Sequence, residues 1–255
     1  MTRSTRRVVA LVGSRRKRNT HQVVRQVSEL LAQDGVEVEP HRITEFSIEH
    51  CNGCERCLRG GDCPIRDDQG RLERLLCDAD GLILASPVYM DGPSSRLKTF
   101  IDRTCRWFHR PPLVGKPVLV IATSAASGVK ATTAYLQDVG IKWGMQPAGR
   151  IGRTVRTLER PVSPREVASF ARHLRLEPAR YRPRLRQILM FQVQKVLAEK
   201  VLTVDREFWR ARGWLDRVYY DGVRVPPHLW LVGRSFHALL HARVRKVEDE
   251  PPSSE

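Results

Sequence analysis

Four cysteines lie within a stretch of thirteen residues and form the pattern C-x2-C-x2-C-x5-C: Cys51, Cys54, Cys57 and Cys63. This tight spacing, with Pro64 after the last cysteine, approximates the runs that hold iron–sulfur clusters, in which the last interval is shorter. Structural zinc more often uses two separated C-x2-C pairs. The pattern therefore favours cluster ligation over zinc. The alternative is a set of thiols that cycles through disulfides or has lost its metal.

Three segments of small and polar residues each follow an apolar run that predicts a buried strand. They are residues 13–20, 86–95 and 123–128. In an open parallel sheet, ligands bind beyond the carboxyl ends of the strands, and the N–H groups at a helix N-terminus bind phosphate. Ordinary turns would have a similar composition, but three such loops at neighbouring strand ends favour a site for a flat, phosphorylated heterocycle.

The first of these loops offers hydroxyls at Ser14 and Thr20, an amide at Asn19 and positive charge at Arg16. It contains neither the G-x-G-x-x-G fingerprint of dinucleotide sites nor a Walker loop. In the second loop, Tyr89 can pack on or beside a ring. Backbone N–H groups of the small residues in the second and third loops can bond the polar edge of the same ring.

Apolar runs that alternate with amphipathic segments position these loops. The runs are typical of strands buried on both faces, and the segments between them have apolar residues at helical spacing. Because parallel strands need crossover connections, the alternation predicts an α/β fold with helices on both faces of a five-stranded parallel sheet. The expected strands are residues 8–12, 36–39, 81–86, 116–123 and part of 145–153, and the expected helices are residues 21–33, 93–108, 129–143, 163–173 and one that follows Asp67-Asp68.

The sheet pattern ends near residue 178, which predicts a domain over residues 1–178 and a helical extension over residues 179–255. In the extension, residues 183–204 have an amphipathic helical pattern with Arg and Lys on the polar side. Three of the five tryptophans lie in this part of the chain, so we expect it to pack on the sheet or on a second subunit. Residues 248–255 are acidic and contain Pro and Ser, which predicts a loose tail.

Charge and hydropathy bear on whether the protein binds nucleic acid or spans a membrane. Lys and Arg number 44 against 28 Asp and Glu, and the resulting charge of +16 is spread along the chain. A diffuse basic surface attracts any polyanion and specifies none, so no specific nucleic-acid partner is expected. No apolar run approaches the roughly 18 residues of a membrane-spanning helix, and the run at residues 8–12 is shorter than an export signal requires. We expect a cytoplasmic protein without a transmembrane segment.

Over residues 7–175 the sequence resembles the flavodoxin-like NAD(P)H-dependent FMN reductases, and its cysteine run is similar to that of the iron–sulfur flavoproteins within that group. The resemblance rests on Gly13-Ser14 with Asn19-Thr20, on the cysteine run that leads into Asp67-Asp68, and on Ser86-Pro-Val-Tyr89 followed by Leu97-Lys-Thr-Phe-Ile-Asp-Arg103. It implies a flavodoxin-like, doubly wound sheet with strand order 2-1-3-4-5 and FMN at its carboxyl edge.

The resemblance also implies roles for individual residues and for two further cofactors. By it, Ser14, Asn19 and Thr20 hold the phosphate, and we expect the charge of Arg16 to assist them. Pro87, Val88 and Tyr89 would flank the isoalloxazine, and Thr123, Ser124, Ser127 and Gly128 would contact its polar edge. Cys51, Cys54, Cys57 and Cys63 would ligate a [4Fe-4S] cluster. NAD(P)H would deliver hydride, and a quinone, another small acceptor or the cluster would take the electrons. Because the cofactor carries this chemistry, no catalytic side chain is expected.

A homodimer or larger homo-oligomer is expected from the resemblance, because members commonly complete the flavin pocket from a neighbouring chain. Two features depart from the family pattern. The first loop is rich in Arg and one residue shorter than usual, and Ala125-Ala126 stand where glycines are common. The alternative function is a cofactor-free basic scaffold that binds nucleic acid or an anionic membrane surface.

Overall fold

The computed structural model describes residues 5–247, and within them five parallel strands form one sheet in the order β2-β1-β3-β4-β5. The strands are β1 (Arg6–Val12), β2 (Val36–Arg42), β3 (Gly81–Pro87), β4 (Pro117–Ser124) and β5 (Gln146–Thr154). The predicted α/β class and the predicted strand order are both confirmed.

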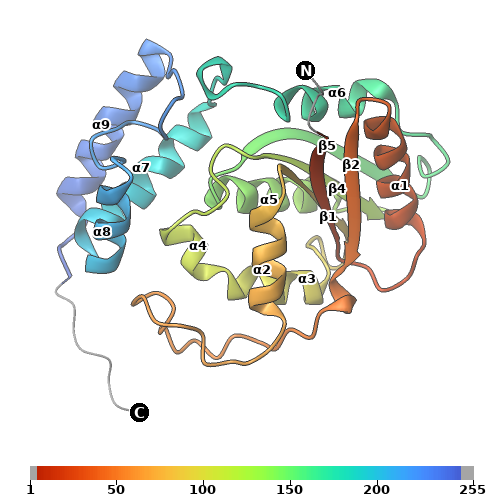
Figure 1. Cartoon of the computed structure of the whole chain (residues 1–255), viewed down its shortest axis with the longest axis horizontal. Coiled ribbons are helices and arrows are strands. Elements are labelled where there is room, and N and C mark those ends of the chain that lie inside the picture. Colours follow the sequence, from red (N-terminus) through yellow and green to blue (C-terminus); the bar gives the residue numbers. More distant parts are fainter. Residues whose placement is uncertain (1–4, 248–255) are drawn as a thin grey trace. The chain divides into compact units, whose positions relative to one another are not determined.

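Helices cover both faces of this sheet (Figure 1). On one face α1 (Asn19–Ala32) and α6 (Pro164–His173) pack on alternate residues of the strands and form a continuous apolar core. On the other face lie α2 (Gln69–Asp78), α3 (Ser95–Arg103) and α5 (Val129–Lys142). The middle residues of β1, β3 and β4 are fully buried, as expected for strands that are covered on both sides.

The helix expected over residues 93–108 is two helices, α3 and α4 (Cys105–His109). They are separated at Thr104, a β-branched residue whose hydroxyl competes with the helical pattern. This hydroxyl donates to the Ile101 carbonyl at 2.6 Å and accepts the indole N–H of Trp143 at 3.1 Å. The buried hydrogen bonds of Thr104 therefore account for the break.

The chain divides into two compact units. The first contains the sheet and comprises the residues up to Gly53, Ile65–Thr104 and Pro112–Arg175; the second comprises Cys54–Pro64, Cys105–Pro111 and the residues from Leu176 onward. The second unit thus includes two short segments from earlier in the chain. The division at residue 178 stays a prediction, and the tail at residues 248–255, predicted to be loose, lies outside the described residues.

The second unit is built on α7 (Leu185–Lys200), α8 (Thr203–Ala211) and α9 (Pro227–Arg243). The helical pattern expected over residues 183–204 is confirmed over α7 but ends at Lys200, because Leu202 has an extended backbone that separates α7 from α8. Rings in contact with one another fill the interior: Phe191, Trp209, Trp214, Tyr219 and Tyr220. Two single turns of 3-10 helix, Ile43–Glu45 and Pro178–Arg180, complete the regular structure of residues 5–247.

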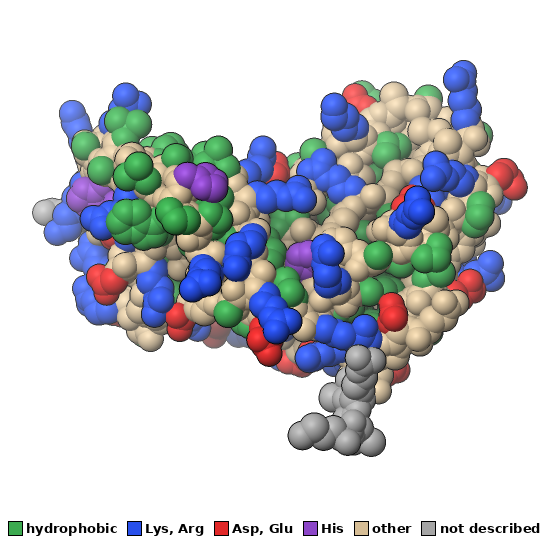
Figure 2. Space-filling view, turned by 90° about the horizontal axis from the view of Figure 1, so that it is seen from above, with side chains coloured by type: hydrophobic (Ala, Val, Ile, Leu, Met, Phe, Trp, Pro, Cys, Tyr) green, Lys and Arg blue, Asp and Glu red, His purple; other side chains and the backbone are tan. Residues whose placement is uncertain are grey.

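The surface agrees with the diffuse charge seen in the sequence. On the face drawn in Figure 2, Lys and Arg side chains are distributed over the whole surface, with Asp and Glu among them. Of the helices between residues 5 and 247, none combines the length and the apolar character needed to cross a bilayer.

A buried ion pair joins the end of β5 to the start of α6. The Arg153 guanidinium, 4% exposed, donates to both carboxylate oxygens of Glu166 at 2.9 Å. Glu166 also accepts the backbone N–H and the hydroxyl of Ser163, the residue that precedes the helix. The hydrogen bonds from Arg153 lower the pKa of Glu166 to about 2 despite partial burial.

We predict that Glu166→Gln lowers the free energy of unfolding by about 3 kcal/mol at neutral pH, because it leaves the Arg153 charge buried without a carboxylate. A carboxylate whose folded-state pKa is lowered contributes stability above its unfolded pKa of 4.5 and loses it as the pH falls toward 2. Urea unfolding between about pH 5 and pH 3 should therefore be less pH-dependent in the variant than in the wild type.

Glu29→Gln is the matched control, because Glu29 forms an exposed ion pair with Arg25 at 3.6 Å. Removing such a pair costs less than about 1 kcal/mol. Equal losses of stability in the two variants would show that the buried pair contributes nothing special.

Candidate functional site

The loops that follow β1, β3 and β4 line a single pocket of about 650 Å³, a volume in the usual range for small-molecule sites. We call it the rim pocket. Its lining consists of Ser14, Arg15, Arg16, Arg18, Asn19, Thr20, Pro87, Val88, Tyr89, Thr123, Ser124 and Ala125. The structure therefore brings together all of the cofactor-binding residues expected from the sequence except Ser127 and Gly128. Arg15, Arg18 and Ala125 were not singled out, although they lie in the same loops.

Hydrogen bonds fix the three loops to one another. The Gly13 N–H donates to the Ala85 carbonyl at 2.7 Å, which continues the pairing of β1 with β3. The Val88 N–H donates to the Thr123 carbonyl at 2.8 Å, which continues the pairing of β3 with β4. The hydroxyls of Thr20 and Thr123 are 2.7 Å apart and buried. The first loop is therefore tied directly to the third across the pocket floor.

Gly128 shapes the pocket although it does not line it. Its φ of +80° is one that residues with a Cβ rarely adopt. A Cβ at this position would lie 2.4 Å from the Asp91 Oδ1 and 2.6 Å from the Val88 Cγ1. Glycine therefore lets the third loop approach the second. The predicted contact of Ser127 and Gly128 with a ring stays a prediction.

A tight turn presents Tyr89 at the open side of the pocket. Tyr89 and Gly92 exchange two backbone hydrogen bonds of 2.9 and 3.0 Å, and the residues between them, Met90 and Asp91, both have positive φ, at 47° and 60°. Two such residues are typical of a type I′ turn, and strained backbone of this kind is common at ligand sites. Tyr89 is 62% exposed, so its ring is accessible to a planar molecule.

The rim pocket is positively charged. Arg15, Arg16 and Arg18 line it, and the lining includes no Asp or Glu. The first turn of α1, which begins at Asn19, adds N–H groups that no helical carbonyl accepts and the positive end of the helix dipole. These features suit a phosphate group.

His21 supports the first loop without adding charge to it. The ring hydrogen-bonds the backbone of Ser14, and burial, with the nearby charges of Arg42 and Lys17, lowers the pKa of His21 below its ordinary value. The imidazole therefore remains neutral at physiological pH and acts as a positioning group for the loop.

A buried ion pair closes the base of the cysteine loop in the first unit. The side chains of Arg103 and Asp67, 2% and 4% exposed, are 2.7 Å apart. Asp67 also accepts the backbone N–H groups of Glu49 and Gln69 at 2.9 and 3.0 Å, and Arg103 donates to the Glu49 carbonyl at 2.8 Å. Burial raises the pKa of Asp67, but these hydrogen bonds outweigh it and hold the pKa below its usual value. The two ends of the loop are thus fixed to one another.

In the second unit, Arg110 holds the middle of the cysteine loop. Its guanidinium donates to the carbonyls of Cys57 and Leu58, the latter at 3.0 Å. It is paired with the fully buried carboxylate of Asp205, which also bonds His109 Nδ1 at 2.8 Å. The C-terminal extension, whose role the sequence did not indicate, therefore shapes the turn that carries Cys57.

The four cysteines of the loop do not form a ligand set in this structure. Cys51 and Cys54 are exposed, and Cys57 and Cys63 are partly buried. Among residues 5–247, no group of three or more His, Cys, Asp or Glu side chains is placed to hold a metal ion. Cluster ligation by the four cysteines therefore stays a prediction.

Comparison with known proteins adds independent findings. The family model described as NADPH-dependent FMN reductase matches residues 6–156. An iron-sulfur flavoprotein of Archaeoglobus fulgidus is 31% identical over 221 residues, which cover 82% of this chain and 100% of that protein. A match of this extent exceeds residues 1–178 and so reaches into the C-terminal extension.

Two further similarities are more limited. An iron-sulfur flavoprotein of Methanocaldococcus jannaschii is 37% identical over 99 residues, which cover 38% of this chain and 51% of that protein. A crystal structure of RosB with bound 8-demethyl-8-formylriboflavin-5′-phosphate has a TM-score of 0.55 and 13% identity, over 67% of this chain and 79% of its own. At that identity, the likeness to RosB shows the fold alone.

We predict that Asp67→Asn loosens the cysteine loop, because it leaves Arg103 buried without a carboxylate, at a cost of about 3 kcal/mol. Trypsin should cleave at the arginines between residues 56 and 66 at least tenfold faster under native conditions, as measured by mass spectrometry of the early fragments.

Two variants control for this result. Asp102→Asn removes an exposed ion pair with Lys98 on α3, the helix that carries Arg103, and should leave cleavage unchanged. Glu166→Gln costs similar stability at a site away from the loop, so it should not favour cleavage between residues 56 and 66. Equal acceleration in Asp67→Asn and Glu166→Gln would mean that the clamp acts only through global stability.

Proposed function

Because the chain belongs to the NADPH-dependent FMN reductase family, we propose that FMN binds in the rim pocket and that the protein takes hydride from NAD(P)H and passes electrons to a quinone or another small acceptor. The coarser assignment, an FMN-dependent oxidoreductase, follows from the family. The observation that carries the finer proposal is that three loops, at three neighbouring strand ends, line one cationic pocket.

The first loop would hold the phosphate of FMN. Ser14 and Thr20 offer hydroxyls and Asn19 an amide, beside the N–H groups of the first turn of α1. Arg16, with its neighbours Arg15 and Arg18, supplies the positive charge. A phosphate carries close to two negative charges, so charge-assisted hydrogen bonds from this loop would give most of the specificity for FMN over riboflavin.

The second and third loops would hold the ring system. Pro87 and Val88 line the pocket beside Thr123 and Ser124, and the exposed Tyr89 ring lies at the open side. Bound FMN would supply a ring that accepts hydride and releases electrons singly or in pairs. The residues position and enclose that ring, and no side chain in the pocket is required as a general acid or base.

Flavin titration tests the proposal. Purified protein should quench flavin fluorescence on binding FMN, and NADPH or NADH should bleach the flavin absorption band under anaerobic conditions. Protein that refuses FMN, yet binds DNA or anionic vesicles with steep salt dependence, would favour the scaffold alternative. If the protein binds FMN but neither nucleotide reduces the bound flavin, FMN stands as the cofactor and NAD(P)H is ruled out as the electron donor.

We predict that Arg16→Gln raises the Kd for FMN about tenfold and leaves the Kd for riboflavin unchanged, since it removes a charged donor to the phosphate. Arg25→Gln is the matched control, because Arg25 is a well-exposed residue of α1 outside the rim pocket. Equal weakening of FMN and riboflavin by Arg16→Gln would place the phosphate elsewhere.

The [4Fe-4S] cluster is a second part of the proposal. The spacing of Cys51, Cys54, Cys57 and Cys63 and the names of the relatives support it, although residues 5–247 contain no preformed group of metal ligands. No electron-transfer step is therefore assigned to a cluster.

We predict that protein purified without oxygen contains roughly four iron and four sulfide per chain. Cys57→Ser should abolish this content, while the exposed Cys105, changed to Ser, should not. Both variants should bind FMN as the wild type does. Protein that binds flavin but contains no iron would rule out the cluster and leave the reductase proposal standing.

A homo-oligomer and a cytoplasmic location stay predictions. Gel filtration with light scattering tests the first, and cell fractionation tests the second.

A further inference from the structure

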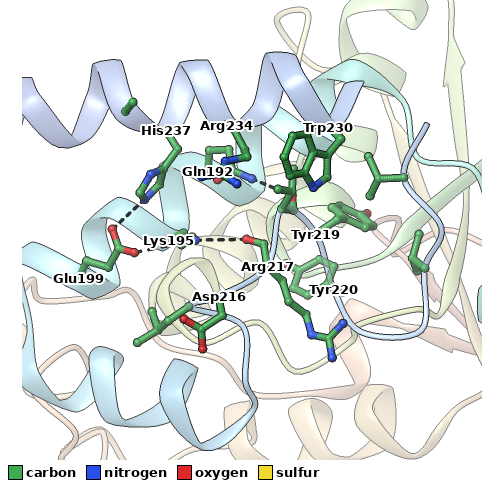
Figure 3. Close-up of a pocket in the computed structure, with 15 residues that line it drawn as sticks. Gln192, Lys195, Glu199, Asp216, Arg217, Tyr219, Tyr220, Trp230, Arg234 and His237 are labelled. Carbon is green, nitrogen blue, oxygen red and sulfur yellow. Dashed lines mark hydrogen bonds and ion pairs between the residues drawn. The ribbon is translucent and has the colours of Figure 1, made fainter. Parts of the chain in front are cut away.

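A second pocket, of about 610 Å³, lies wholly within the second unit. It is formed by α7, by α9 and by the segment over residues 215–225 (Figure 3). Figure 3 shows Arg234 and His237 of α9 facing Lys195 and Glu199 of α7. None of the residues that line it belongs to the rim pocket.

The floor of this pocket is fixed by side chains of α7. The ammonium group of Lys195 donates to the Arg217 carbonyl at 3.2 Å, and the amide of Gln192 donates to the Val218 carbonyl at 2.7 Å. Gly233 allows α9 to pack closely here, since a Cβ would lie 2.7 Å from the Val218 side chain. Hydrogen bonds and close packing therefore fix the segment over residues 215–225 against α7 and α9 at this pocket.

Most of the basic groups in the lining have an acidic partner. Glu199 is bonded to His237 at 2.8 Å and lies 4.0 Å from Lys195. The other acidic residue of the lining is Asp216, against the bases Lys195, Arg217 and Arg234. Arg217 forms an ion pair at 3.0 Å with Asp221, which lies outside the lining. Among residues 5–247, Arg234 is therefore the base of the lining that is left without a carboxylate.

Arg234 is available to bind an anion. Its guanidinium lies over the Trp230 ring, 4.9 Å from the ring centroid. Within residues 5–247, no carboxylate lies at ion-pair distance from it. Burial lowers the pKa of Lys195, the carboxylates of Glu199 and Asp216 oppose this, and the Arg234 charge adds to the lowering. Lys195 and Arg234 line the same pocket from facing helices (Figure 3), so an anion bound there would be attracted by both charges.

Aromatic side chains line the end of the pocket away from Glu199 and His237 (Figure 3). Trp230 is 43% exposed at the mouth of the pocket, and Tyr219 and Tyr220 lie buried beneath it. The Tyr219 hydroxyl accepts the amide of Gln187 and the Tyr220 hydroxyl donates to Gln194. Both hydroxyls are thus satisfied inside the unit, and the pocket offers ring surface on which a planar group can stack.

We propose that this pocket is a second ligand site that binds a small aromatic carboxylate, with the carboxylate between Lys195 and Arg234 and the ring against Trp230. The two cations recognise the charge, and the exposed indole face recognises the ring. The site is separate from the rim pocket and its test does not depend on flavin binding.

Isothermal titration of the full chain with 4-hydroxybenzoate tests the proposal. The wild type should bind it at least tenfold more tightly than 4-hydroxybenzamide, which has the same ring and no charge. Arg234→Gln should abolish this preference, and Trp230→Leu should weaken both ligands to a similar degree. Arg243→Gln, an exposed charge of α9 outside the pocket, should change neither.

Lys195→Met should also abolish the preference, but it removes the bond to the Arg217 carbonyl, so the exposed Arg234 provides the decisive variant. Circular dichroism and thermal unfolding of each variant report whether the fold is retained. Failure of the wild type to bind 4-hydroxybenzoate, equal affinity for the benzamide, or unchanged binding by Arg234→Gln would each overturn the proposal. None of these outcomes bears on FMN in the rim pocket.

Discussion

The parallel register of β1, β3 and β4 is the constraint on which the rim pocket depends. Since all three strands run in one direction, the segments that leave them emerge at the same edge of the sheet. The backbone hydrogen bonds from Gly13 to Ala85 and from Val88 to Thr123 extend this register one residue into the loops. The side chains that line the pocket are thereby held at fixed separations by main-chain pairing, with little dependence on their own packing.

Two buried ion pairs fix the cysteine loop, and the free energy needed to bury them bears on their role. Removing an ion pair from water costs several kcal/mol, and apolar residues of similar size often stabilise a fold as well or better. Arg103 with Asp67, and Arg110 with Asp205, nevertheless hold backbone groups of the loop or of its ends. Apolar side chains could not bond those groups. The pairs therefore contribute geometry more than stability, in a segment that has no regular structure between Phe46 and α2.

Local patterns in the sequence predicted the sheet and most of the rim pocket, because strand burial and turn composition are properties of short segments. Three features depend on contacts between distant residues and were not predictable in that way. Thr104 interrupts a helix through its bond to Trp143. Gly128 is required by the approach of Asp91 and Val88. Asp205 holds an arginine 95 residues earlier in the chain, and no spacing within one segment reveals such a pair.

The clamp between Arg103 and Asp67 has a consequence for how this fold diversifies. Bonds from Asp67 to Glu49, Gln69 and Arg103 join the two ends of the cysteine loop. The loop is therefore closed at its base, where it meets the rest of the first unit. Closing a longer appendage adds only about 0.6 kcal/mol for each doubling of its length. Changes in the length of the intervening segment therefore cost the sheet little, because the bonds at its base fix where it leaves and rejoins the first unit.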